Sequence, residues 1–298
     1  MKTFLTEKRI TTGEKIFYAV NYIIMTLLAF IMLFPIINVI ATSFSSSRAI
    51  ASGEVSLLPV EFTLSAYNSI INDGQIFRSM LNTVIITVIG TALNMIFTIM
   101  AAYPISKQRL HGRKLFTWIM LFTMLFSGGM IPNFILVKSI GFMDSYLALW
   151  VPGLISVYNM IILKSFFENM PISLEEAAQI DGAGVLHILI TIVLPLSTPV
   201  LATLTLFYAV GHWNNYMNAL IYITSSAKQP LMLKLMQMLS NVTEAMQRSG
   251  EGAGATEQLM PESIKAASIV VAIFPIMCIY PFLQKYFVKG VMVGSIKG

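Results

Sequence analysis

The sequence SLEEAAQIDGAG, from Ser173 to Gly184, is a short polar stretch between two strongly apolar segments. It contains three acidic residues and two glycines, whereas the flanking segments 145–167 and 192–222 contain no Asp or Glu. Each flanking segment is long enough to cross a bilayer, which takes about 20 apolar residues. We therefore expect the polar stretch to lie at a membrane surface, between two spans.

The composition of the whole chain agrees with a membrane location. The 298 residues are 56% hydrophobic and only 11% charged, and the mean hydropathy is +0.75. Soluble domains are about half apolar and about a quarter charged, so this composition indicates an integral membrane protein. The net charge of +5 does not indicate nucleic-acid binding, because the cations stand beside apolar runs and form no basic stripe.

Six apolar segments are long enough to be transmembrane helices, and all fourteen acidic residues fall outside them or at their edges. The segments are roughly 16–43, 81–105, 115–137, 145–167, 192–222 and 266–288. The first follows a basic N-terminus, but it is too long for a signal peptide and is interpreted as a retained span. The predicted fold is an all-α polytopic membrane protein with six transmembrane helices.

The positions of Lys and Arg predict the orientation, because cytoplasmic loops are enriched in these residues. Cations gather in the N-terminus, in the loop KQRLHGRK at 107–114 and in the C-terminal tail, where Lys285, Lys289 and Lys297 lie. With six spans these regions share one side, which places both termini in the cytoplasm. The predicted parts are a cytoplasmic N-terminus at 1–15, a transmembrane domain at 16–290 and a cytoplasmic tail at 291–298. Loops at about 44–80, 138–144 and 223–265 then face outward, and Ser173–Gly184 is cytoplasmic.

Within the opening stretch, Ser173 and Glu176 have the spacing of a helix-capping box. Glu175 and Glu176 also suit the positive end of a helix dipole. The i, i+3, i+4, i+7 rhythm of a helix is followed by Leu174, Ala177, Ala178 and Asp181. These features predict a short helix with one face of small residues.

Glycines and prolines predict a turn and a second helix after this short helix. Gly182 and Gly184 permit a sharp turn before Val185 starts another helix. Pro195 and Pro199 mark a bend where that helix enters the fifth span. The predicted result is a helix, a turn and a second helix across the cytoplasmic mouth, at 171–195.

The same residues resemble a known family motif. Position by position, they match the pattern EAA-x3-G-x9-I-x-L-P, with Glu176, Ala177, Ala178, Gly182, Ile192, Leu194 and Pro195 at the fixed positions. This pattern resembles the permease subunits of bacterial ABC importers. The longer run EEAAQIDGAG…IVLPLSTPVLATL and the C-terminal FVKGVMVGSIKG are similar to the carbohydrate branch, near the smaller maltose/maltodextrin-type permease.

The resemblance implies a role for the short helix. In that family it is a coupling helix that docks into a cleft of the ATPase subunit. The implied coupling residues are Glu175, Glu176, Ala177, Ala178, Asp181 and Gly182. Alternatives remain for three of them: Glu176 as a helix cap, Gly182 as a turn residue and Asp181 as a solvated side chain. The family also implies a second homologous permease subunit, a dimer of ATP-binding subunits and an extracytoplasmic solute-binding protein.

Several kinds of chemistry are missing from the sequence. It has no G-x-x-x-x-G-K-[ST] loop, so ATP hydrolysis is expected in a separate partner subunit and the chain itself is not expected to be an enzyme. No cofactor or metal site is predicted, because the three histidines are widely spaced. No ionisable group clearly lies in mid-membrane, which disfavours an ion-coupled secondary transporter.

Polar residues inside the spans are candidates for the substrate path. The fifth span contains GHWNNYMNALIYI, and the candidates are Trp213, Asn214, Asn215 and Tyr216, together with Tyr158 from the fourth span. Aromatic faces and amides are the groups that bind sugars. The alternatives are that the asparagines join helices and that Trp213 belongs to the interfacial belt. Asn82, Asn94 and Asn159 are weaker candidates, and FSGGMIP at 126–132 is either a gating break or a packing site.

The predicted function is the transmembrane permease subunit of an ATP-dependent oligosaccharide importer. An ABC permease for peptides, amino acids or phosphate, an ion-coupled transporter and a membrane scaffold remain as alternatives. The sequence leaves open whether the sugar is neutral or acidic. The spans contain no clear cationic cluster, but Lys138 and Arg78 lie near the predicted outer mouth.

Overall fold

The computed structural model describes residues 11–72, 74–249 and 262–278, and every regular element in these ranges is a helix. The all-α prediction is therefore confirmed for this part of the chain. The chain divides into two compact units, 1–72 with 242–271 and 73–241 with 272–298, which are described separately. Residues 1–10 of the predicted N-terminal segment and the whole predicted C-terminal segment 291–298 lie outside the described residues.

The first unit is built on one long apolar helix. Its helices are α1 (Thr12–Ser43), α2 (Ser47–Ala51) and α3 (Ser65–Asn72). A capping box starts α1, since Thr11 and Glu14 each accept a hydrogen bond from the other's backbone N–H. The helix has 32 residues and is strongly apolar, and none of its most apolar 18-residue stretch is buried within the chain. It is long enough to cross a bilayer.

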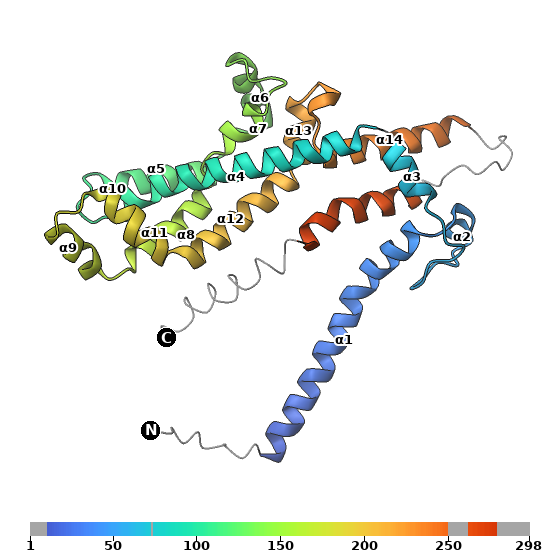
Figure 1. The fold of residues 1–298 in the computed structure, drawn as a ribbon, viewed down its shortest axis with the longest axis horizontal. Helices are drawn as coiled ribbons and strands as arrows, with labels where there is room; N and C mark the ends of the chain where they lie inside the picture. Colours follow the sequence, from blue (N-terminus) through green and yellow to red (C-terminus); the bar gives the residue numbers. More distant parts are fainter. Residues whose placement is uncertain (1–10, 73, 250–261, 279–298) are drawn as a thin grey trace. The chain divides into compact units, whose positions relative to one another are not determined.

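The second unit is centred on α4 (Ile76–Ser106), which packs along α8 (Val157–Glu168) and α12 (Thr198–Trp213), as Figure 1 shows. Met160, Leu163 and Leu204 are fully buried where these helices meet. The 31 residues of α4 extend about 46 Å at roughly 1.5 Å per residue, which exceeds the hydrocarbon thickness of a bilayer. This helix is therefore long and apolar enough to cross a membrane.

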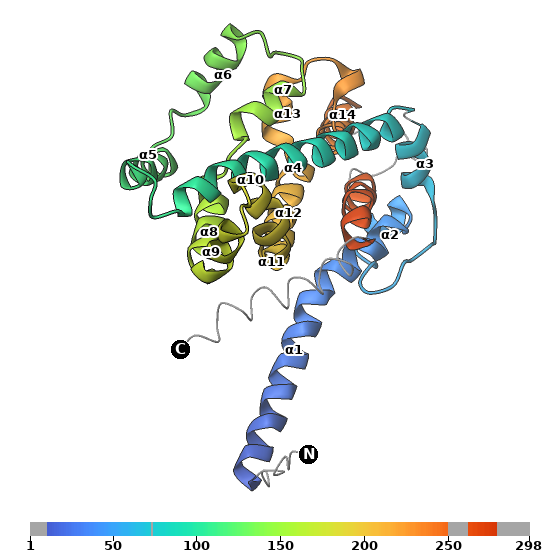
Figure 2. The same cartoon turned by 60° about the vertical axis from the view of Figure 1, so that its left-hand side comes forward.

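Three of the predicted spans are bent rather than straight. The third divides into α5 (Arg113–Leu125) and α6 (Met130–Ser139), the fourth into α7 (Leu147–Trp150), η1 (Val151–Gly153) and α8, and the fifth into helices over Val185–Leu196 followed by α12. The bends are 111°, 49° and 83° respectively, and Figure 2 shows the change of direction from α5 to α6. Among the described residues, two helices alone qualify as spans, or up to five if each bent pair is one span.

Glycine and proline explain these bends. Gly129, between α5 and α6, has φ +86°, a conformation that side-chain-bearing residues rarely adopt. Pro152 lies in η1, and Pro195 and Pro199 flank the break at Ser197, as the sequence predicted. The single span predicted at 192–222 is wrong in extent, because α12 ends at Trp213 and a separate helix α13 (Tyr216–Tyr222) follows.

The predicted outer loop 223–265 also contains helix. A short 3-10 helix η3 (Ser226–Lys228) precedes α14 (Leu231–Ser249), a 19-residue amphipathic helix with Leu231 and Leu233 buried. Residues 262–278 form a further helix, and the rest of the sixth predicted span lies outside the described residues. With its long apolar helices, the chain is an integral membrane protein.

Candidate functional site

The stretch between the fourth and fifth predicted spans forms helix α9 (Ile172–Ile180), followed by a turn and α10 (Val185–Ile188). The helix begins at Ile172, ahead of the predicted N-cap. Its N-cap is Pro171, which makes no side-chain capping bond, and Ser173 lies inside the helix. The predicted capping box of Ser173 and Glu176 is therefore wrong, because Pro171 has φ −59° and the chain enters the helix directly after it.

Gly182 terminates α9 in the manner of a Schellman motif. It has φ +82°, and a Cβ there would meet nothing within 4 Å, so the requirement for glycine is one of backbone conformation. The Ala183 N–H donates to the Ala178 carbonyl (2.9 Å), and the Gly182 N–H donates to the Gln179 carbonyl (3.0 Å). The predicted sharp turn is confirmed.

One side of α9 faces the second unit's core. Ala178 packs against the buried cluster that contains Met160 and Leu163. Glu175 forms an ion pair with Lys107, the residue directly after α4, and both side chains are largely buried. The Lys107 ammonium also lies 4.4 Å from the ring centroid of Tyr103. Glu175, rather than Glu176, therefore holds α9 to the end of α4.

The other side of α9 is exposed. It carries several apolar side chains, although the segment as a whole is polar. Glu176, Ala177 and Asp181 are exposed. The apolar side chains that share this exposure are Ile172, Leu174, Ile180, Val185 and Leu186, with Ile180 86% and Leu186 72% exposed. Exposed large apolar side chains on an otherwise polar segment are candidates for an interaction site. Ile172, Ile180 and Leu186 were not among the predicted coupling residues, although Ile180 and Leu186 interrupt an otherwise polar stretch.

A polar cavity of about 520 Å³ lies among α4, α6, α8, α12 and α13. Side chains that carry amide, hydroxyl, imidazole or aromatic groups dominate its lining, namely Asn94, Asn133, Ser156, Asn159, Phe207, Tyr208, His212, Asn215, Asn218 and Tyr222. None of the described residues that line it is Lys, Arg, Asp or Glu. The cavity therefore offers many neutral hydrogen-bonding groups beside aromatic faces.

His212 occupies a fixed position in the wall of this cavity. Its Nε2 lies 2.6 Å from Oδ1 of Asn94, and the Asn94 amide nitrogen donates to the carbonyls of Gly153 (2.6 Å) and Leu154 (3.0 Å). Because Oδ1 can only accept, this arrangement assigns the proton to Nε2 of His212. A Cβ at Gly90 would lie 2.6 Å from the same Nε2, so α4 needs glycine at this position.

The candidate path residues do not all lie in the cavity. Asn215 lines it, whereas Trp213 is buried (7% exposed) and donates from Nε1 to the Ala272 carbonyl at 3.2 Å. Asn214 and Tyr158 are exposed and do not line the cavity, and Tyr216 packs against a buried apolar cluster. The weaker candidates Asn94 and Asn159 do line it. Asn133, Ser156 and Tyr208 were missed, although each is a polar group within an apolar span.

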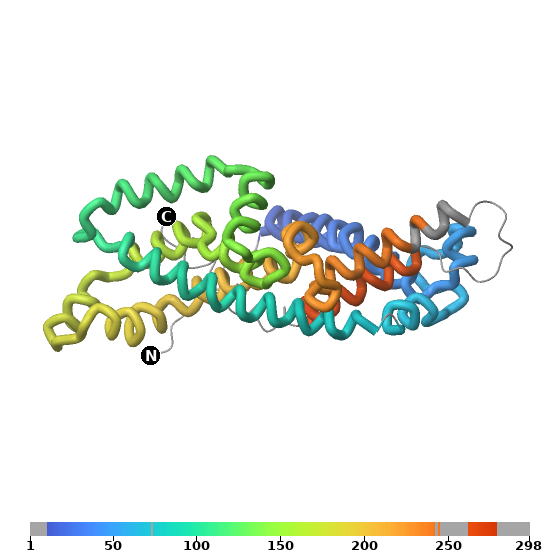
Figure 3. The backbone as a smooth tube through the Cα atoms, turned by 90° about the horizontal axis from the view of Figure 1, so that it is seen from above, coloured from blue at the N-terminus to red at the C-terminus, as the bar shows by residue number. Residues whose placement is uncertain are grey.

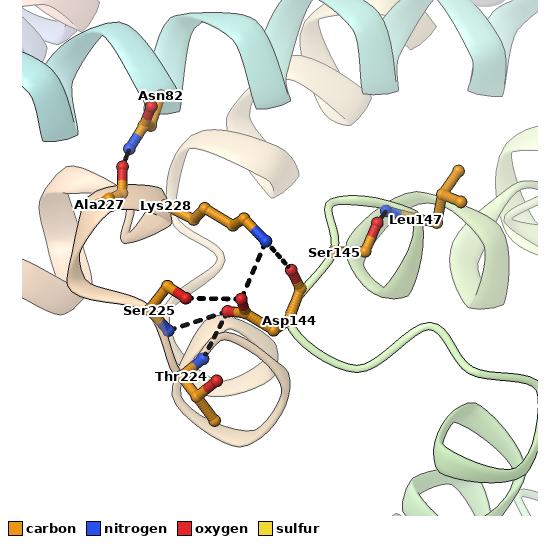
Figure 4. A network of polar contacts seen from close by, with 8 residues as sticks. All are labelled: Asn82, Asp144, Ser145, Leu147, Thr224, Ser225, Ala227 and Lys228. Atoms are coloured by element: carbon orange, nitrogen blue, oxygen red, sulfur yellow. Dashed lines mark hydrogen bonds and ion pairs between the residues drawn. The ribbon is translucent and has the colours of Figure 1, made fainter.

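A second polar site joins two loops beside the cavity (Figure 4). Asp144 Oδ1 accepts from the backbone N–H groups of Thr224 (3.0 Å) and Ser225 (2.8 Å). Its Oδ2 accepts from the Ser225 hydroxyl (2.6 Å) and the Lys228 ammonium (2.9 Å). The Ser225 hydroxyl foremost, and then Lys228, hold the pKa of Asp144 well below its usual range. We call Asp144, Thr224, Ser225 and Lys228 the Asp144 clamp.

Helix α9 lies beyond the end of α4 (Figure 3), whereas the Asp144 clamp lies next to residues that contact the first part of α4. Near the start of α4, the Asn82 amide donates to the carbonyls of Ala227 (2.9 Å) and Gln229 (3.1 Å), beside Lys228 of the clamp. Directly after its end, Lys107 pairs with Glu175 of α9. The two sites therefore lie near different ends of α4, a helix longer than the hydrocarbon layer of a bilayer is thick.

Apolar helices that line a polar cavity, with a polar helix at one end, fit the class of integral membrane permeases. The chain belongs to the family described as "Binding-protein-dependent transport system inner membrane component", whose model matches residues 94–293. Its resemblance to ABC importer permeases, first seen in the motif at Glu176–Pro195, is confirmed.

Similar proteins agree over nearly the whole chain. The polygalacturonan/rhamnogalacturonan transport system permease protein YtcP of Bacillus subtilis is 45% identical over 288 residues, which are 96% of this chain and 99% of the relative. Protein LplC of the same organism is 42% identical over 290 residues, 97% of each chain. A solved bacterial ABC transporter involved in the import of the acidic polysaccharide alginate has a chain with TM-score 0.81 and 34% identity, covering 93% of this chain and 98% of that one.

The function class follows from this membership. The chain is the permease subunit of an ABC importer, and the similar proteins named for a substrate are carbohydrate transport permeases or importers. Family membership favours this function over an ion-coupled secondary transporter or a membrane scaffold.

Proposed function

We propose that the chain is one of two membrane subunits of an importer for oligosaccharides that carry carboxylate groups. The polar cavity is the observation that carries this proposal. Its amides, hydroxyls and tyrosines match the hydroxyl groups of a sugar, and Phe207, Tyr208 and Tyr222 supply aromatic surface for its C–H faces. The relatives named for polygalacturonan/rhamnogalacturonan and for acidic alginate favour an acidic sugar.

Neutral hydrogen-bond donors suit a carboxylate that must be released from the path after binding. Amide and hydroxyl groups hydrogen-bond a carboxylate without the deep energy well that a buried cation would create. A translocation path needs binding weak enough for release. We therefore assign the path to the cavity and, of the residues predicted for it, retain Asn215. The other residues predicted for the path contribute instead through packing within this chain or through contact with a partner subunit: Trp213, Asn214, Tyr216 and Tyr158.

The proposed topology is six spans with both termini in the cytoplasm and α9 as the cytoplasmic coupling helix between spans four and five. The opposite positions of α9 and the Asp144 clamp on α4 support it. The cations Lys107, Arg109, Arg113 and Lys114 lie at the α9 end, as the positive-inside rule requires of the cytoplasmic side.

The proposed partners follow from surfaces that this chain leaves open. The apolar residues of α1 are exposed along most of the helix, and we assign lipid and a second homologous permease subunit to cover them. The exposed face of α9 fits a cleft of an ATP-binding subunit. There Ile180 and Leu186 insert and Glu176 pairs with a cation, while Ala177 allows close approach and Asp181 remains solvated. An extracytoplasmic solute-binding protein delivers the sugar.

Uptake by whole cells tests the substrate class. A strain lacking the gene for this chain is complemented with wild type, Asn159→Ala or Asn215→Ala, and given radiolabelled oligogalacturonide or radiolabelled maltodextrin. We expect the wild type to restore uptake of the oligogalacturonide alone. Each variant removes one neutral hydrogen bond, worth about 1 kcal/mol, so uptake at low substrate concentration should fall about fivefold. Restored maltodextrin uptake without oligogalacturonide uptake would show that the substrate is neutral.

A further inference from the structure

A basic cavity of about 570 Å³ lies where the α4–α5 loop meets the start of α5 and the end of α8. The polar, charged and aromatic side chains on which a ligand would depend are those of Gln108, Arg113, Lys114, Trp118 and Lys164, all of which line the cavity. It is separate from the sugar cavity, with which it shares no lining residue. Gln108 and Arg113 also line a neighbouring cavity beside α9, whereas Lys114, Trp118 and Lys164 line neither that cavity nor the sugar cavity.

The charges around this cavity are unbalanced. Glu168 is the carboxylate paired with its cations, and Oε1 of Glu168 contacts both Arg113 and Lys164, the latter at 2.9 Å. Arg113, Lys114 and Lys164 together carry three positive charges against this one negative charge. The Lys164 side chain is only 14% exposed, so its charge is directed into a partly desolvated site. An anionic ligand would neutralise the remaining positive charge.

The surroundings identify the kind of anion. Trp118 lines the cavity and is 70% exposed, and the neighbouring α5 side chains Leu115, Ile119 and Phe122 are also exposed. Exposed apolar side chains on a membrane helix face acyl chains, and tryptophan is enriched at headgroup depth. Cations and lipid-facing residues thus meet within the first turns of α5. A phospholipid has the same arrangement, with a phosphate above its acyl chains.

We propose that this cavity binds the phosphate of an anionic phospholipid, with an acyl chain along α5. Lys114 and Lys164 contact the phosphate, Gln108 donates a further hydrogen bond, and Trp118 lies against the upper acyl chain. The site adjoins the loop that carries Lys107, the partner of Glu175 on α9. A bound lipid therefore stabilises the loop against which α9 rests. The inference depends on the membrane location of the chain and not on the identity of the sugar.

Quenching of Trp118 tests the site in the complete importer. The complex is placed in nanodiscs of phosphatidylcholine that contain increasing fractions of brominated phosphatidylglycerol or, separately, brominated phosphatidylcholine. The difference between wild type and Trp118→Phe isolates the Trp118 fluorescence. We expect brominated phosphatidylglycerol to quench at a much lower fraction than brominated phosphatidylcholine. The preference should weaken about fivefold for each lysine removed in Lys114→Gln and Lys114→Gln/Lys164→Gln.

Two comparisons distinguish a bound lipid from a bound free phosphate and from a general effect of surface charge. Lys138→Gln, an exposed lysine on α6, should keep the full preference, because it does not line the cavity. Excess inorganic phosphate should leave the quenching unchanged. Equal quenching by both lipids, or loss of the preference in free phosphate, would overturn the proposal. If the double variant fails to assemble, the exposed Lys114 carries the test alone, and an unchanged preference in Lys114→Gln also overturns it.

Discussion

At the scale of single residues, the polar cavity depends on a glycine that does not line it. Gly90 leaves room on α4 for the His212 ring, and Asn94, one turn further along, holds that ring through a 2.6 Å contact. Asn94 in turn is fixed by the carbonyls of Gly153 and Leu154. Three helical segments therefore determine the position of one imidazole.

The first prediction concerns Gly90→Ala. An added methyl would lie 2.6 Å from Nε2 of His212, so the ring must move away from Asn94. Overpacking of this kind costs about 1–3 kcal/mol. We expect a lower thermal unfolding temperature in detergent. Gly211→Ala is the matched control, because a Cβ there meets nothing within 4 Å and Ala is the better helix former. Equal unfolding temperatures for both variants would contradict the close approach.

The second prediction concerns the ion pair that holds α9 to the end of α4. Lys107 and Glu175 are both largely buried, so reversing one charge should weaken the contact and reversing both should restore it. We expect Lys107→Glu and Glu175→Lys each to lower sugar-stimulated ATP hydrolysis in the assembled importer, and the double reversal to recover much of it. Glu176→Gln should leave the unfolding temperature unchanged, because Glu176 is exposed. Additive losses in the double reversal would show that the pair does not position α9.

At the scale of helices, the sequence predicted which apolar helices exist better than it predicted where they bend. Apolar length located α1 and α4, and the prolines at 195 and 199 predicted the bend before α12. The 111° bend between α5 and α6 was left undecided, because a Gly-Gly pair in an apolar run serves equally well as a packing site. The capping box failed because Pro171, immediately before α9, starts the helix by fixing its own φ. Helix α14 was missed because its amphipathic pattern lies in a segment too polar to span a membrane.

The third prediction concerns the Asp144 clamp, which joins the α6–α7 and α13–η3 connections. Since the folded-state pKa of Asp144 is depressed, the clamp stabilises the fold fully above the unfolded pKa of about 3.9 and less as pH falls below it. We expect Asp144→Asn to lower the unfolding temperature at pH 7. Between about pH 5 and pH 3, the unfolding temperature of the variant should fall less than that of wild type. Glu54→Gln, an exposed carboxylate, is the control. The same acid sensitivity in wild type and Asp144→Asn would show that the clamp contributes nothing.

At the scale of the whole molecule, the site residues predicted by family resemblance and those found by geometry differ in kind. The motif at 176–195 led directly to α9, because its spacing is tied to a turn at Gly182. The polar cavity depends on side chains from several helices, and no local pattern in a single sequence reports which polar residues of separate helices converge. Trp213 was therefore a reasonable candidate by composition, yet it donates a hydrogen bond to the helix at 262–278 instead.

The most direct test of the account is ATP-driven uptake of radiolabelled oligogalacturonide by proteoliposomes that contain the complete importer and its binding protein. Wild type should take up sugar only when ATP is present on the α9 side, and a proton or sodium gradient should not replace ATP. Ile180→Glu, which places a charge at a strongly exposed apolar side chain of α9, should abolish uptake, whereas Gln179→Glu at the neighbouring position should retain most of it. Uptake by this chain alone on an ion gradient, or full ATP-driven uptake in Ile180→Glu, would contradict the account.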